Sequence, residues 1–279
     1  MAIASTILDL AQRTLGFDRS DIGIPGLEED QLLAVCGQAV IEYHERFKGG
    51  GGEPSSILQR ESGAVLTADT TTAEAITSAT TDFDVTDSAD FPVSGVLAVW
   101  EDDQPDYIAF TGNAADNFTG VTGIGYSHAS GVTVSRLYPL PSDFSDFRSS
   151  PESPYGVTVD GNAFVHTSGT PMAGQFHLYD NGTTKYLSFA QGVTGNMAVR
   201  YNANPTTVDA AGDSVDVPEK DQWFVVWRIV QYAAPILGKM EQYQIATDRA
   251  ERIMTHALIT RNIGKRPKVR PMRSFIITR

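Results

Sequence analysis

Apolar residues recur at helical spacing near the N-terminus of the chain. Residues 4–15 and residues 28–47 each carry apolar side chains at steps of three and four, with polar side chains between them. This period is typical of an amphipathic helix. Neither helix can bury its apolar stripe alone, so each one needs a partner elsewhere in the chain.

The same period returns in residues 218–262. Its first part is apolar on every side, and Pro235 is expected to kink the run or split it in two. A helix without a polar face must be covered by other parts of the protein. We therefore predict that one set of residues packs in the core or between subunits, namely Trp223, Trp227, Val230, Leu237 and Met240.

Between these helical regions the spacing changes. From residue 59 onward, short runs rich in Val, Thr and Phe are separated by turn residues about every ten positions. This pattern predicts many short strands. We divide them into a small inserted β module, residues 59–138, and an antiparallel β region, residues 139–217.

The order of these elements predicts an α+β fold. The two N-terminal helices, within residues 1–58, would pack against long C-terminal helices in residues 218–262 and form a helical bundle. The β material would be a long antiparallel excursion from one end of that bundle. Residues 263–279 contain two prolines among alternating cations, which favours an extended basic arm.

Charge separates the body of the chain from its C-terminal end. The 279 residues contain 21 basic and 34 acidic side chains, a net charge of −13. Residues 261–279 hold seven of the basic side chains and no acidic one, so residues 1–260 carry a net charge of −20. An acidic body repels nucleic acid, whereas a basic end can bind nucleic acid, an acidic partner or a neighbouring copy.

The cysteine and histidine content gives no sign of catalytic, cofactor or metal chemistry. Cys36 is the only cysteine and lies on an apolar stripe, which excludes an internal disulfide and favours a core position. The five histidines do not form a zinc-binding pattern. His166 and His177 have the spacing of adjacent strands and could face each other.

The sequence also argues against a calcium-binding loop and against a membrane span. The aspartates at positions 82, 84, 87 and 90 lack the glycine and glutamate of a calcium-binding loop, so turn capping is the better interpretation. No apolar run reaches the roughly 18 residues of a membrane span. We therefore predict no catalytic, cofactor or metal site and no membrane contact.

The basic end of the chain carries apolar side chains as well. Disordered tails are usually poor in such residues, yet this one ends with Phe275, Ile276 and Ile277. Docking on a partner protein is therefore the interpretation we prefer over nucleic-acid binding or disorder. The predicted docking residues are Lys265, Arg266, Lys268, Arg270, Arg273, Phe275 and Arg279.

This order of elements resembles the head-to-tail adaptor proteins of tailed bacteriophages, which form a ring beneath the portal. The resemblance covers about residues 1–50 and 139–279, and residues 62–138 depart from its smaller members. Those departing residues are similar to small β modules of phage structural proteins. The segments that carry the resemblance are the N-terminal helix pair, Leu140–Phe144, Met197–Tyr201 with Asn204-Pro205, and Val217–Glu219 before the C-terminal helices.

The resemblance implies a structural virion protein of the neck, assembled in the cytoplasm of a bacterial host. It implies a ring of about twelve copies that binds the portal protein through the basic arm and a tail or nozzle protein below. The genome would cross this ring without specific binding, because binding to phosphates needs basic residues. Residues 62–138 would project outward, where they could carry tail fibres or contact the capsid.

Two other functions stay open at this point. One is a tail fibre or carbohydrate-binding β module, which exposed Trp100, Tyr107 and Tyr126 in a shallow groove would favour. The other is a glycan hydrolase, which needs a convergent pair of carboxylates in a cleft.

Overall fold

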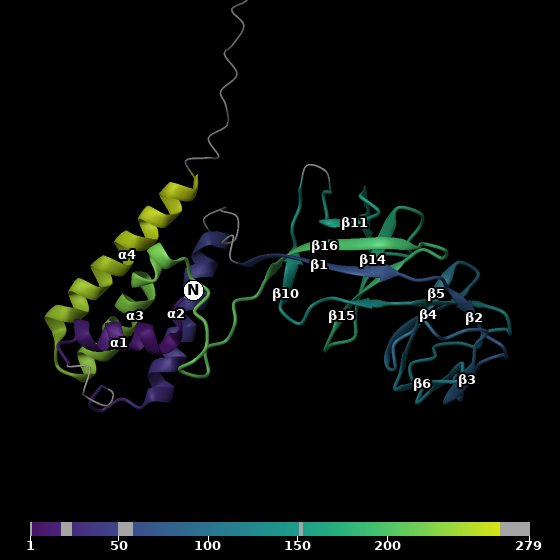
Figure 1. Ribbon diagram of the computed structural model, residues 1–279, viewed down its shortest axis with the longest axis horizontal. Helices are drawn as coiled ribbons and strands as arrows, with labels where there is room; N and C mark the ends of the chain where they lie inside the picture. The colour runs from purple at the N-terminus through teal and green to yellow at the C-terminus, as the bar shows by residue number, and fades with distance from the viewer. Residues whose placement is uncertain (1, 18–23, 50–57, 151–152, 263–279) are drawn as a thin grey trace, which may run out of the picture. The chain divides into compact units, whose positions relative to one another are not determined.

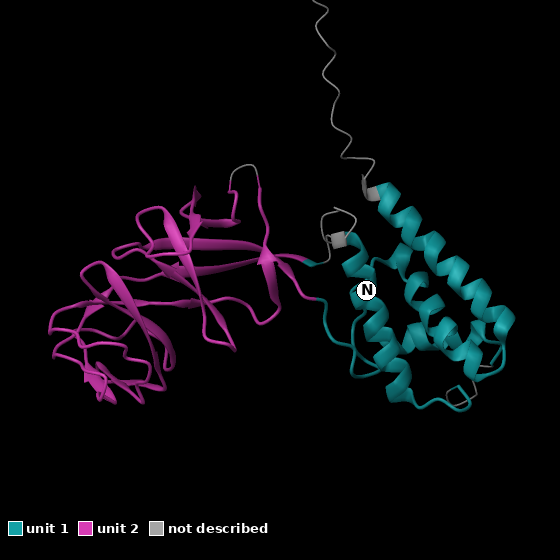
Figure 2. Cartoon of the chain, turned by 180° about the vertical axis from the view of Figure 1, so that it is seen from behind, with its two compact units in different colours: residues 1–58, 205–279 teal, residues 59–204 magenta. Residues whose placement is uncertain are grey.

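The chain folds into two compact units, which Figure 2 shows in different colours. A computed structural model describes residues 2–17, 24–49, 58–150 and 153–262. The helical unit comprises Met1–Leu58 and Pro205–Arg279, and the β unit comprises Gln59–Asn204. The two stretches of the helical unit are therefore joined through the whole β unit.

The predicted fold class is wrong. In the described part of the chain, strands dominate: there are 16 strands in four sheets and four α-helices, so the chain is not a helical bundle with long C-terminal helices. The sequence pattern does predict many short strands, but most have only two to seven residues, and no local signal shows that they assemble into four sheets. The helical region at the C-terminus is divided into two helices near Pro235, as its sequence predicts.

The helical unit is organised around α3. Its α-helices are α1 (Ala4–Thr14), α2 (Glu29–Gly49), α3 (Trp223–Ile236) and α4 (Met240–Asn262), with a 3₁₀ turn, η2 (Glu219–Asp221), before α3. Helix α3 contacts the other three helices, and its buried residues point in almost every direction around the axis. Small residues on the inner face of α4, Ala246, Ala250 and Ala257, let α4 pack closely against α3.

Helix α3 ends at a defined break. Pro235 cannot donate a backbone hydrogen bond, and Gly238 follows it with a φ of 68°, in the left-handed region. The Lys239 N–H donates to the Ala234 carbonyl over 2.8 Å, and the Gly238 N–H donates to the Pro235 carbonyl over 3.0 Å. This pattern is a helix C-cap of the Schellman type, and it separates α3 from α4.

The first part of the β unit consists of two sheets around a shared core. One sheet has the order β1 (Gln59–Leu66), β16 (Gly195–Ala203), β11 (Val157–Val159), β12 (Asn162–Ala163), with β10 (Phe144–Phe147) also on β16. The other has the order β13 (Val165–Thr167), β14 (Gln175–Asp180), β15 (Lys185–Phe189), β9 (Tyr138–Pro139). Apolar residues of both sheets, including Val157, Phe176, Leu187 and Val199, form the core.

Strand β1 belongs to this pair of sheets. All eight of its residues pair antiparallel with β16, from Gln59 opposite Asn202 to Leu66 opposite Gly195. The sequence pattern places residues 59–66 in the small β module, because no local signal shows a pairing between segments so far apart. The two strands run side by side in Figure 1.

The second part of the β unit is a compact pair of small sheets. One has the order β2 (Thr70–Thr71), β8 (Thr133–Arg136), β4 (Gly95–Glu101), β5 (Gln104–Phe110). The other has the order β3 (Asp82–Asp84), β7 (Asn117–Thr119), β6 (Gly112–Ala114). Phe83, Phe91 and Phe110 surround Phe118 at centroid distances of 4.8 to 5.5 Å and fill the core between them.

Strand β4 connects the two parts of the β unit because both of its faces are covered. Leu97 and Val99 point into the small core beside Phe118. Val96, Ala98 and Trp100 form a separate apolar cluster, against which Tyr107, Tyr179 and Tyr186 pack. This two-sided burial explains why the strand is apolar at consecutive positions instead of alternating.

Candidate interaction surface

Exposed apolar side chains are concentrated on α3 and α4. Of the fourteen large apolar residues that are exposed in the described part of the chain, six lie within residues 223–260. They are Trp223, Tyr232, Ile236, Met240, Ile245 and Ile259. Contiguous exposed apolar side chains mark sites of interaction, whereas single ones are ordinary, so the neighbouring residues of this set are the candidates for such a site.

The burial of α3 places its exposed apolar residues at its two ends. The N-end surface consists of Trp223, which is 43% exposed, beside the half-buried Trp227, with ring centroids 6.0 Å apart. We call Tyr232, Ile236 and Met240, at the end of α3 and the start of α4, the C-end surface: Tyr232 and Ile236 lie one helical turn apart, and Met240 is 55% exposed. Ile236 lies thirteen positions after Trp223, which is about 20 Å along a helix.

The predicted packing residues therefore have different surroundings. Trp223 and Met240 are exposed, Trp227 and Leu237 are half-buried, and Val230 is fully buried in the core of the helical unit. Sequence reasoning missed Tyr232, Ile236, Ile245 and Ile259. The signal for Tyr232 and Ile236 was their spacing of one helical turn beside the break at Pro235.

A ring of four charges links three helices of the helical unit. Arg228 Nη2 lies 2.5 Å from Glu42 Oε1 and 2.9 Å from Glu251 Oε1. Arg46 completes the ring, 2.6 Å from Glu42 and 2.7 Å from Glu251. The Arg46 hydrogen bond lowers the pKa of Glu251, although partial burial opposes this shift. The ring links α2, α3 and α4 with alternating signs.

Buried polar contacts fix the segment that enters α3. The Tyr43 hydroxyl donates to Asp221 Oδ2 over 2.6 Å, and His44 Nε2 lies 2.6 Å from the Asp216 carbonyl oxygen. At the other end of α3, Lys239 Nζ donates to the Leu15 carbonyl oxygen. These contacts tie the N-terminal helices to both ends of α3 and make its two surfaces rigid features.

The predicted docking arm cannot be placed on this surface. Its residues, Lys265, Arg266, Lys268, Arg270, Arg273, Phe275 and Arg279, lie outside the described part of the chain. The net positive charge of this segment follows from the sequence alone.

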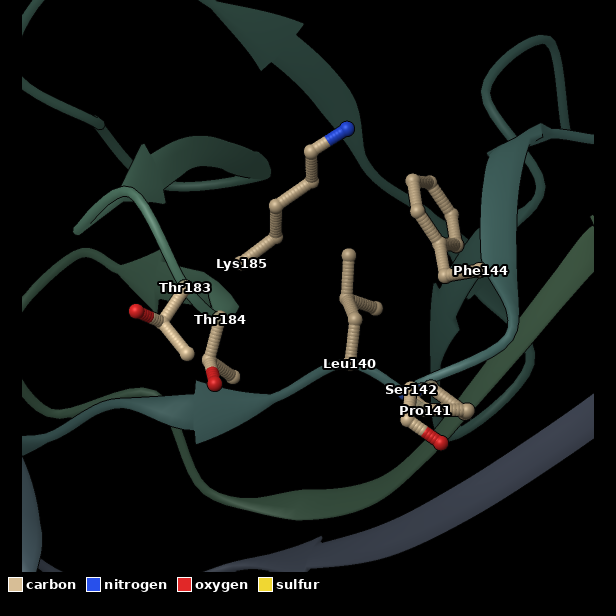
Figure 3. Close-up of a pocket in the computed structure, with 7 residues that line it drawn as sticks. All are labelled: Leu140, Pro141, Ser142, Phe144, Thr183, Thr184 and Lys185. Atoms are coloured by element: carbon tan, nitrogen blue, oxygen red, sulfur yellow. The ribbon is translucent and has the colours of Figure 1, made fainter.

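Two pockets of the β unit are lined entirely by described residues. One, of about 200 Å³, is lined by Leu140, Pro141, Ser142, Phe144, Thr183, Thr184 and Lys185. Figure 3 shows that the Lys185 amine points away from the hydroxyls of Thr183 and Thr184, toward the Phe144 ring. The other, of about 490 Å³, contains a single carboxylate among its lining residues, Asp103. Neither pocket therefore offers the carboxylate pair of a glycan hydrolase.

The aromatic residues that would favour carbohydrate binding are mostly covered. Trp100 is buried and donates through its indole nitrogen to Ser135 Oγ over 2.9 Å, while Tyr107 packs on Tyr179 at 4.5 Å. Of the three, only Tyr126 is exposed. They do not form an exposed aromatic platform.

The histidines have structural positions. His166 pairs with Phe176 and His177 with Thr167, so the two imidazoles point to opposite faces of their sheet and do not face each other. His128, which sequence reasoning did not single out, is buried between Glu101, at 3.1 Å, and Asp106, at 3.2 Å. It ties the loop before β8 to the β4–β5 hairpin.

Other candidate sites also have structural roles. Asp87 Oδ1 accepts a hydrogen bond from the Ala89 N–H over 2.9 Å, and Asp84 Oδ1 accepts one from Asn117 Nδ2 over 2.6 Å. Within the described ranges, no group of three or more His, Cys, Asp or Glu side chains could hold a metal ion.

Burial raises the pKa of the Cys36 thiol to about 12. A search of the described helices for one that could span a membrane also found none.

No family model matches this chain, and no curated protein matches it either. Its function is therefore argued from the surfaces and charges described above.

Proposed function

We propose that the chain is a structural virion protein, an adaptor that forms a ring between the portal and the tail of a bacteriophage. The observation that carries this proposal is the pair of separate apolar surfaces at the two ends of α3. A contact between copies that joins two different surfaces repeats from one copy to the next, and it closes into a ring when the rotation allows. The N-end surface of one copy would contact the C-end surface of its neighbour.

The charge distribution supports a passage for DNA. Residues 1–260 carry a net charge of −20, so a channel lined by this body would attract no phosphate backbone. DNA could then pass through a ring of about twelve copies without being held. The ring would be built in the host cytoplasm and reside in the neck of the virion.

The basic C-terminal end supplies the proposed contact with the portal. Its seven cations and its apolar end residues favour an acidic protein surface as partner. One such arm binds weakly, but about twelve arms on one ring act together through their effective concentration. A tail or nozzle protein would bind the opposite side, and residues 62–138 would offer a place for tail fibres.

Complementing variants test the self-association directly. Trp223→Asp removes the N-end surface, and Ile236→Asp removes the C-end surface; both residues are exposed, so the fold should survive. We expect neither variant to assemble alone. Mixed together, they retain one intact surface each and should form dimers that grow no further, as measured by native mass spectrometry with portal present.

A matched control comes from the β unit. Met172 is 70% exposed there, and Met172→Asp should leave ring formation unchanged. Rings formed equally well by Trp223→Asp or Ile236→Asp would refute the proposed interface. Removal of residues 264–279 should abolish portal binding, and a truncated chain that binds portal as tightly as the full chain would refute the role of the arm.

A further inference from the structure

Strand β1 is a long strand at one edge of its sheet. It lies at the end of its sheet and pairs with β16 alone among the described strands. In an antiparallel pair, alternate residues direct their N–H and C=O groups away from the partner. Residues 60–65 therefore present a row of backbone groups that can pair with another strand.

The other edge strands of the β unit are protected, whereas β1 is not. Edge strands β2, β9 and β12 have two residues each, and β3, β6 and β13 have three. Strand β10, which also pairs with β16 alone among the described strands, has four residues and a register shift between Phe144 and Asp146. Strand β5 is longer but contains Pro105 and bonds to Thr122 beyond its sheet. Strand β1 has eight residues, no proline and no lysine. Short length, proline and lysine are the usual means of preventing edge pairing.

The side chains of β1 leave room for a further strand. Ser62 and Ala64 face the core of the sheet pair but are small and only half-buried, so that core is thinly covered at this edge. On the opposite face Val65 is 63% exposed. The charged residues of β1 are already engaged: Arg60 with Asp143 at 3.2 Å, and Glu61 with Arg200 at 3.0 Å.

The end of the chain has the chemistry of a matching strand. Phe275, Ile276, Ile277 and Thr278 are consecutive residues of high β-propensity. The flanking residues are basic, whereas the β unit contains 17 acidic and 5 basic side chains. Seventeen residues follow α4; fully extended they span about 55 Å, enough to reach another molecule.

We propose that residues 274–278 of one copy pair with the open edge of β1 of another copy when no portal is bound. Main-chain hydrogen bonds along β1 would supply the affinity, and apolar side chains of the added strand would cover the core beside Ser62 and Ala64. The same residues then have two acceptors, β1 before assembly and the portal afterwards. The pairing itself does not depend on the proposed ring.

A peptide experiment tests the acceptor. A fluorescent peptide of residues 273–279 is titrated into the chain that lacks those residues, and binding is followed by anisotropy. Val65→Lys places a lysine on the open edge and should weaken binding at least tenfold. Val93→Lys, which alters another exposed valine of the β unit, adds the same charge and should leave binding unchanged.

A second peptide separates strand pairing from charge attraction. Ile277→Pro in the peptide keeps its net charge but removes a backbone donor, so binding should be lost. Equal binding of both peptides, or equal affinity for the two lysine variants, would overturn the proposal. A urea unfolding curve establishes that Val65→Lys is folded.

Hydrogen exchange on the full chain shows which copy provides the strand. Protection of the amides of residues 60–65 should increase with protein concentration and fall in a chain truncated after Arg273. Protection that does not change with concentration would mean that the strand comes from the same copy, which would overturn the proposal. This readout needs no portal, so its failure is distinct from failure of the ring.

Discussion

Arg228 is a polar position at which a single substitution should weaken the helical unit. Its side chain is 13% exposed and contacts Glu42 and Glu251. It also donates to Gln231 over 2.6 Å, and its guanidinium lies 5.2 Å from the centre of the Phe224 ring. Arg228→Ala removes a charge shared by three helices and leaves Glu42 and Glu251 facing each other with only Arg46 between them.

The cost of Arg228→Ala in unfolding free energy depends on how exposed Glu42 and Glu251 are. Removing one member of a buried ion pair costs about 3–5 kcal/mol. Here Glu42 and Glu251 are 31% and 47% exposed, so water recovers part of that cost and we expect about 2–4 kcal/mol. Arg228→Met keeps the apolar stem over Phe224, and its difference from Arg228→Ala separates packing from charge.

Urea unfolding followed by tryptophan fluorescence measures this change. Trp223 and Trp227 lie on α3, whereas Trp100 lies in the β unit, so a Trp100→Phe background confines the signal to the helical unit. Arg252 is the matched control: its pair with Asp248 is 73% and 57% exposed, and Arg252→Ala should cost less than about 1 kcal/mol. Equal effects of the two alanine variants would refute the assignment of Arg228 as the central link.

Three further predictions concern the same unit. Tyr43→Phe leaves the buried Asp221 without its hydroxyl donor and should cost about 2 kcal/mol in urea unfolding, whereas Tyr232→Phe, at an exposed position, should change stability by less than about 0.5 kcal/mol. Because burial raises the pKa of Cys36 to about 12, its alkylation near pH 8 should follow unfolding of the helical unit, and rapid labelling of the folded chain by mass spectrometry would contradict this. The pKa of Glu251 is lowered in the folded chain, so its ionisation stabilises the fold at pH values above the ordinary glutamate pKa of about 4.3. This stabilisation is lost as the pH falls through the folded-state pKa. Glu251→Gln should therefore flatten the decline of the urea midpoint in this acid range.

Helix positions could be predicted from the sequence because long periodic segments carry their own signal. Helices α1 and α2, at Ala4–Thr14 and Glu29–Gly49, lie where the apolar spacing places them. The break at Pro235 is also visible locally, because proline and the glycine three residues later act on their own backbone. These features depend on residues within a few turns of one another.

The fold class could not be predicted in the same way. The sheets depend on pairings such as that of Arg60 with Tyr201, which no local pattern reveals. Strand β4 shows the difficulty most clearly: its consecutive apolar residues result from burial on two faces by segments far away in the chain. We took the helical segments as the organising element, whereas sheets hold more of the chain.

The candidate surface was only partly predictable for a related reason. Trp223 and Val230 are both apolar and belong to the same helical pattern in the sequence. The packing of α1, α2 and α4 around α3 is what shows that Trp223 is exposed and Val230 is buried. Exposure is a property of neighbours, so residues such as Tyr232 and Ile236 cannot be selected until those neighbours are known.

The two proposals rest on one physical contrast within the molecule. Most apolar and backbone groups of both units are satisfied internally: α3 is enclosed along its length, and most sheet edges are short. Among the exceptions are the two ends of α3 and the edge of β1, and these two exceptions differ in their chemistry. Side chains at the ends of α3 can be covered by any complementary apolar surface, which suits repeated contacts between copies. The backbone groups of β1 require an extended strand, which suits a segment that can be bound and later released to another partner.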